Sequence, residues 1–170
     1  MPFPGSAKQP YFDALLQAYE AEVAGETYFK TLTGVFSGPD QHEKLMLLAD
    51  VEQRTWITLR PLIKRHRLEP LDSAVLAARG KTWVIERAFQ RWKDLMDNMT
   101  THYPGFIEEF KALEAVGPDE DKCALKVLVR HEVALLAFAE REAAGDASSL
   151  APVRAFLADF QFLTPGEFAP

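Results

Sequence analysis

Apolar residues recur along this chain at alternating steps of three and four, the spacing that gathers them on one face of an α-helix. Four long stretches keep this period, and Gly, Pro and Asp residues lie between them as breaks. The stretches run from Pro10 to the turn at 37–40, from that turn to Arg67, from Asp72 to Thr101, and from the turn at 117–119 to Gly145. We therefore expect four long amphipathic helices.

Two shorter helices complete the prediction. Residues 106–115 follow the helix-breaking Tyr-Pro-Gly at 103–105, and Ser148 begins a last helix that ends near Phe160. No alternation of β-branched residues lasts long enough for a strand. We expect an all-α antiparallel four-helix bundle, with a short helix inserted between the third and fourth helices and another at the C-terminus. The bundle should span 10–161, between a flexible lead at 1–9 and a tail at 162–170.

Glutamates interrupt the apolar faces of three of these helices. Glu26, Glu52 and Glu132 each lie at the centre of an apolar stripe, and Glu22 lies on the same face one turn before Glu26. A carboxylate on a core-facing stripe costs several kcal/mol unless something compensates its charge. Inward carboxylates on facing helices are also the way in which bundles build oxygen-rich metal sites. A bound metal, a paired cation or protonation would each account for them.

The glutamates lie in the segments AYEAEVAGETYFKTL, KLMLLADVEQRTWITL and VLVRHEVALLAFAERE. These segments resemble the ferritin-like di-iron carboxylate proteins, including the rubrerythrin and aldehyde-deformylating oxygenase branches. The resemblance implies a ferritin-like bundle with an iron or manganese site, in which Glu26, Glu52 and Glu132 match family ligands. Glu22 joins them as a candidate ligand because it shares the face of Glu26.

The chain departs from the family pattern at both histidine ligands. Thr55 and Leu135 occupy the positions three residues after Glu52 and Glu132, where the family has His, and the chain contains no Glu-x-x-His. His131 is adjacent to Glu132, so a helix turns it about 100° away, and we expect it to be solvated or bonded to a neighbouring helix. Two further side chains lie near the expected site but off its centre. They are His131 and Glu86, and Glu86 lies at the edge of the third apolar stripe.

Two functions fit these residues. The first is a degenerate ferritin-like protein with an incomplete di-metal site, acting as a binding or structural module. The alternative is a metal-binding oxidoreductase-type protein, whose carboxylate-rich iron or manganese site activates O₂ or peroxide. The missing histidines favour the first, since carboxylates alone suit harder ions than a redox-active di-iron centre needs.

The composition of the chain limits the kinds of partner that we expect it to bind. The 170-residue chain has a formal charge of −6, which disfavours nucleic acid and anionic membrane surfaces as partners. No apolar run approaches the roughly 20 residues that span a bilayer, and no signal peptide is evident. A single cysteine, Cys123, excludes an internal disulfide and multi-cysteine metal sites. We expect a cytoplasmic protein.

Four aromatic residues near the C-terminus fit either a cover over the bundle or a homodimer interface: Phe156, Phe160, Phe162 and Phe168.

Overall fold

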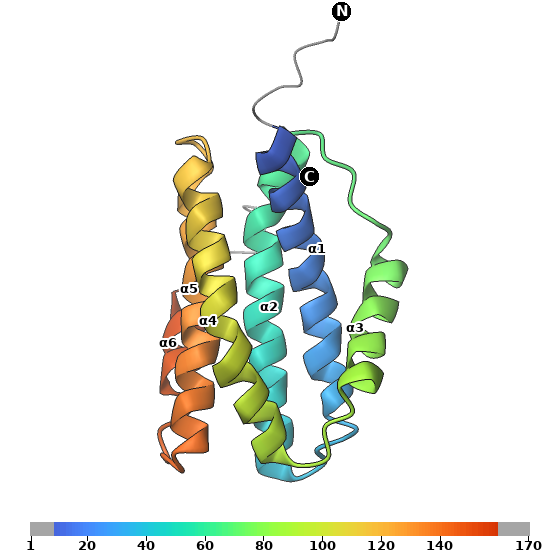
Figure 1. The fold of residues 1–170 in the computed structure, drawn as a ribbon, viewed down its shortest axis with the longest axis vertical. Coiled ribbons are helices and arrows are strands. Elements are labelled where there is room, and N and C mark those ends of the chain that lie inside the picture. The colour runs from blue at the N-terminus through green and yellow to red at the C-terminus, as the bar shows by residue number, and fades with distance from the viewer. Residues whose placement is uncertain (1–8, 160–170) are drawn as a thin grey trace, which may run out of the picture.

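The chain is all-helical throughout the described range in the computed structural model, which describes residues 9–159 (Figure 1). This confirms the expected all-α class. The elements are α1 (Gln9–Leu32), α2 (Pro39–Arg65), α3 (Ser73–Arg87), α4 (Trp92–Val116), α5 (Lys122–Ala143) and α6 (Ala151–Ala158). None of the helices in this range is long and apolar enough to cross a membrane. Gln9, the last residue of the predicted lead, already belongs to α1, so the lead is wrong at this residue. The rest of the lead, the tail and Phe160 lie outside the described residues.

Two helical hairpins form the body of the molecule. The helices α1 and α2 pack along one another, as do α4 and α5, and α2 joins the hairpins by packing against α5. The short α6 rests on α5 and α2, while α3 lies along the outer side of α1 (Figure 1). By contrast, α1 touches α4 over only a short stretch. The two hairpins are therefore less closely packed along α1 and α4 than along α2 and α5.

The predicted third helix is wrong in its extent, because the chain breaks at 88–91 and forms α3 and α4 instead. Ala88 ends α3 in the left-handed conformation (φ 46°), and Arg91 begins α4. The Asp94 carboxylate accepts from the backbone N–H and the guanidinium of Arg91, which closes a capping box around the new helix start. Ile85, which lies on the apolar stripe of the predicted third helix, is 77% exposed because α3 packs on α1 alone.

The separate helix predicted at 106–115 is also wrong. Residues 92–116 form one continuous α4 with Pro104 inside it. A proline within a helix removes one backbone hydrogen bond and favours a kink, but it does not have to end the helix. The packing of α4 along α5 continues on both sides of Pro104, and buried Met99 and Ile107 anchor the two halves.

A glycine allows α3 to pack closely on α1. A Cβ atom at Gly80 would lie 2.3 Å from the carbonyl oxygen of Ala24, far inside van der Waals contact. The sequence marks Gly80 as a weak point of its helix, but the structure uses it as the point of closest approach. This contact holds α3 against the outer face of α1, at the height where α1 carries its buried glutamate.

The interior consists of two apolar clusters with polar residues between them. One cluster, which we call the upper cluster, includes Leu15, Leu59 and Leu125, and the other, the lower cluster, includes Phe29, Leu48 and Phe138. Along α1, α2 and α5 the residues that separate the clusters are buried and ionisable: Glu22, Glu52, His131 and Glu132. We call these four residues the polar layer. Phe156 is buried in the lower cluster, so this aromatic residue covers the helices beneath it.

Candidate metal centre

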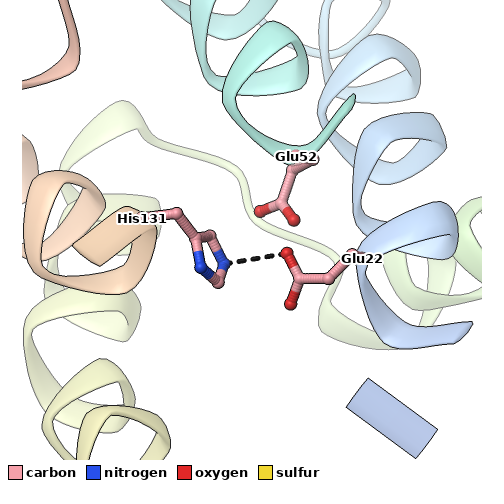
Figure 2. A group of neighbouring side chains, drawn as sticks. All are labelled: Glu22, Glu52 and His131. Atoms are coloured by element: carbon pink, nitrogen blue, oxygen red, sulfur yellow. Dashed lines mark ion pairs between the residues drawn. The ribbon is translucent and has the colours of Figure 1, made fainter. Parts of the chain in front are cut away.

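Three helices bring one ionisable side chain each to a common point. Glu22 from α1, Glu52 from α2 and His131 from α5 each offer a donor atom, and these atoms lie within 4.8 Å of one another (Figure 2). All three residues are buried. Donor atoms bound to a single ion at about 2.1 Å lie about 3–4 Å apart. The group therefore has nearly the spacing of a coordination site, and small side-chain shifts would complete it.

The backbone fixes the orientation of His131. Its Nδ1 lies against the carbonyl oxygen of Leu128, and a carbonyl only accepts, so Nδ1 carries the proton of the neutral ring. Nε2 then carries the lone pair, and it lies 2.8 Å from Glu22 Oε2 and 3.6 Å from Glu132 Oε1. Histidine ligands in proteins are commonly held in this way, with the second ring nitrogen donating to a carbonyl.

Three buried atoms of the polar layer have no hydrogen bond to any residue in the described range. They are Glu22 Oε2, His131 Nε2 and Glu132 Oε2. Glu22 Oε2 and His131 Nε2 are close together, yet the contact lacks hydrogen-bond geometry. Two lone pairs at that distance repel each other unless a proton or a cation lies between them. A protonated group or a bound cation is therefore needed at this contact.

Burial makes the carboxyls reluctant to ionise. It raises the pKa of Glu22 to about 8, where the charge of Glu132 acts in the same direction and a hydrogen bond with Glu52 opposes it. Burial likewise raises the pKa of Glu132 to about 7, against the lowering effect of His131. The pKa of Glu52 rises well above its usual range, from burial and from the charge of Glu22. Without a cation the layer therefore holds protons at neutral pH.

Gly25 provides the space for Glu52. A Cβ atom at this position of α1 would lie 2.8 Å from Glu52 Oε2 and 2.9 Å from its Cδ. The absence of a side chain at Gly25 thus lets the carboxylate reach across from α2 toward Glu22. A helix-interior glycine costs about 1 kcal/mol relative to alanine, so the close approach carries an energetic cost.

The structure brings together Glu22, Glu52 and, at the edge of the group, Glu132, but not Glu26. The Glu26 carboxylate accepts from Trp56 Nε1 at 2.7 Å and from Gln53 Nε2 at 3.1 Å, and it pairs with Lys30. These contacts satisfy the Glu26 carboxylate with partners that do not belong to the polar layer. Glu86 is exposed on α3.

The two positions at which ferritin-like proteins have histidine carry other side chains here, and neither belongs to the polar layer. Thr55 donates to the Val51 carbonyl, and Leu135 is buried in the lower cluster.

The expectation that His131 points away from the carboxylates is wrong, since its side chain is fully buried against Glu22. The buried face of α5 is wide, because α4, α2 and α6 all pack on this helix. It therefore accommodates two adjacent residues, His131 and Glu132. A signal for His131 was present in the spacing of the apolar residues, because steps of three and four connect Leu128, His131, Leu135 and Phe138.

A cavity of about 330 Å³ opens beside the polar layer. Three of its wall residues are the buried carboxyls of Glu22, Glu52 and Glu132, and two exposed residues, Arg87 and His102, also line it. Most of the remaining wall is aromatic and comes from α1, α3 and α4: Tyr28, Phe29, Trp83, Tyr103, Phe106 and Phe110. The cavity occupies the region where α1 and α4 make little contact, so it connects the candidate metal ligands with the surface.

The chain matches no protein-family model, and comparisons with curated proteins and with solved structures find no match either. The chemistry of the site therefore has to be inferred from its own donors, their burial and the cavity beside them.

Proposed function

We propose that this protein binds one divalent transition-metal ion, iron or manganese, through Glu22, Glu52 and His131. We further propose that α1, α2, α4 and α5 form a ferritin-like four-helix bundle around that ion. The single observation that carries the metal proposal is the unsatisfied pair of His131 Nε2 and Glu22 Oε2, buried 2.8 Å apart with no hydrogen bond between them. A cation between these atoms would turn repulsion into coordination.

The donor set supports this choice of metal. Two carboxylates and one imidazole suit Fe²⁺ or Mn²⁺ better than Ca²⁺ or Mg²⁺, which prefer oxygen donors alone. Two ionised glutamates also neutralise the charge of a divalent ion in a buried site. His131 thus supplies the nitrogen donor that Thr55 and Leu135 do not. Iron or manganese held there would supply redox chemistry, so the proposal extends to an oxidoreductase that uses O₂ or peroxide.

The residues around the donors have their own tasks in this proposal. Leu128 holds the ring of His131 with Nε2 directed inward, and Gly25 leaves room for Glu52. Glu132 Oε1 lies 3.6 Å from His131 Nε2, where its carboxyl can take up a proton released when a ligand binds. The apolar clusters above and below shield the layer on those two sides, while the cavity leaves it open toward the surface. The residues around the donors thus orient them and limit access to the site.

Metal analysis tests the proposal. Protein produced with added iron and manganese should carry about one ion per chain, and His131→Ala and Glu52→Gln should each lose it. Glu26→Gln is the matched control, because Glu26 bonds to Trp56 and Lys30 instead of the shared point, and this variant should keep the ion. Circular dichroism checks that each variant is folded. Wild-type protein without bound metal, or full occupancy in His131→Ala, would overturn the proposal.

A second candidate function is a binding or structural module whose metal site is incomplete. The raised pKa values of Glu22 and Glu132 favour it, since neutral carboxyls can remain buried without an ion. The same metal analysis separates the two functions. Metal-free wild-type protein that is as stable as the Glu52→Gln variant would support the module.

A further inference from the structure

The cavity beside the polar layer has two chemically different ends. At its inner end are the carboxyls of Glu22, Glu52 and Glu132, none of them more than 6% exposed. At its outer end lie the exposed side chains of Arg87 and His102. Aromatic side chains fill the wall between the two ends. A ligand that fits such a cavity has an apolar body and only one strongly polar end.

Arg87 is positioned to receive an anion. Its guanidinium carbon lies 4.8 Å from the ring centroid of Tyr28 and 5.5 Å from that of Trp83, so two cavity walls hold it in place. Within residues 9–159 it forms no ion pair with a carboxylate, whereas Arg79 on the same helix pairs with Glu20. The Arg87 guanidinium also hydrogen-bonds the Tyr28 side chain, and its remaining N–H groups stay available for contact with a carboxylate.

The charges of the cavity determine the direction in which such a ligand enters. The buried residues that line the inner end include no cationic side chain, and a metal ion there is already neutralised by two glutamates. The anionic group of the ligand therefore belongs at Arg87, and its apolar end belongs beside the polar layer. Asn98 and His102 add polar groups near the mouth, where His102 Nδ1 donates to the Asn98 carbonyl at 2.9 Å.

The size of the cavity limits the ligand. A volume of about 330 Å³ lies at the lower end of the range for small-molecule sites and equals about eleven water volumes. We propose that the cavity binds a small organic monocarboxylate with an aromatic or short aliphatic body of about ten non-hydrogen atoms. Its carboxylate contacts Arg87 and its apolar end lies against the Glu22–Glu52–His131 group. The inference names a substrate class for the proposed function. That the ligand is a substrate therefore rests on the proposed function.

Binding is measured first in metal-free protein, so that it does not depend on the ion. The probes are 3-phenylpropanoate and octanoate, with the neutral 3-phenylpropanamide as comparison, and the readouts are calorimetry and quenching of tryptophan fluorescence by contact with Trp83. We expect saturable binding of both carboxylates and at least tenfold weaker binding of the amide. Failure of both carboxylates to bind would overturn the inference, even if the protein holds metal.

Variants at the mouth then test the role of Arg87. Arg87→Gln should weaken carboxylate binding about tenfold and leave amide binding unchanged, and Arg87→Lys should restore part of the difference. Asn98→Asp adds a negative charge to the same wall and should also weaken carboxylate binding. Arg141→Gln removes an exposed arginine that does not line the cavity, so it should bind like wild type. Equal carboxylate affinity in wild type and Arg87→Gln would contradict the proposed contact.

The orientation is tested in Mn²⁺-loaded protein. The paramagnetic ion should broaden the NMR signals of the phenyl protons of 3-phenylpropanoate more than those of the CH₂ group next to its carboxylate. The opposite order would overturn the orientation. If the protein binds the carboxylates but takes up no Mn²⁺, the proposed function fails while the Arg87 contact stands. The two proposals are thus separable.

Discussion

Raising the pH of the metal-free protein should lower its free energy of unfolding, because burial raises the pKa of all three carboxyls in the polar layer, those of Glu22, Glu52 and Glu132. A glutamate in the unfolded chain titrates near 4.5, whereas Glu22 titrates near 8 and Glu132 near 7 in the folded protein. Between the unfolded and folded values the folded state binds more protons than the unfolded state. The stabilisation is therefore complete below the pKa of the glutamates in the unfolded state. It is lost as the pH rises through their pKa in the folded state.

The size of the loss follows from the width of that interval. A proton bound only in the folded state changes the free energy of unfolding by more than 1 kcal/mol per pH unit. For Glu22, between 4.5 and about 8, the loss amounts to roughly 5 kcal/mol. Glu132 adds a smaller loss of the same sign, and the two are not additive because the charge of Glu132 raises the pKa of Glu22. Such a loss is comparable to the whole stability of many domains.

Urea unfolding with a chelator present, followed by circular dichroism at closely spaced pH values, measures this loss. Glu22→Gln cannot ionise, so its stability should decline less at the upper end of the interval. Glu26→Gln is the control and should keep the wild-type decline, because Glu26 already pairs with Lys30 outside the layer. Constant or rising stability of the wild type between about pH 5.5 and pH 8 would refute the reasoning.

Two substitutions test other parts of the structure. Gly25→Ala should lower metal affinity, measured by metal titration, at least tenfold because the new methyl group displaces Glu52. The metal-free variant should keep or gain stability, because alanine is a better helix former than glycine. Gly105→Ala, where nothing lies within 4 Å, should leave affinity unchanged; a wild-type affinity in Gly25→Ala would contradict the steric argument. Asp121→Ala should cost about 1–3 kcal/mol in urea unfolding, against little for exposed Asp119→Ala, because it removes a buried carboxylate from Tyr11, Arg65 and His66. A loss below about 1 kcal/mol would show that this network is not stabilising.

The periodicity of apolar residues was sufficient to predict three of the long helices, since each buries one continuous stripe against a neighbour. It failed at 88–91, because the apolar spacing continues across a break that Ala88 and the Arg91–Asp94 capping box determine locally. It failed again at Pro104, where packing against α5 outweighs the loss of a hydrogen bond. Local chemistry decided the first case and tertiary packing the second.

The candidate site was predictable in part for a similar reason. Glu22, Glu52 and Glu132 lie on apolar stripes, and the structure buries all three. Glu26 lies on a stripe as well, but its carboxylate bonds to Lys30, an i,i+4 neighbour that the spacing along α1 allows, and to Trp56 of α2, which the spacing within one helix does not describe. His131 was missed because a stripe was treated as narrow, whereas α5 is covered on several sides.

The polar layer also affects how the two hairpins are held together. Glu22 and Glu52 come from the α1–α2 hairpin, and His131 comes from the α4–α5 hairpin. An ion bound by all three would act as a cross-link between segments separated by about half the chain, at the level where the apolar core is interrupted. Loading would then make the hairpins open together, and amide hydrogen exchange near 22, 52 and 131 would slow to the rate of global unfolding. Without the ion, exchange near these residues should be faster than in the metal-loaded protein.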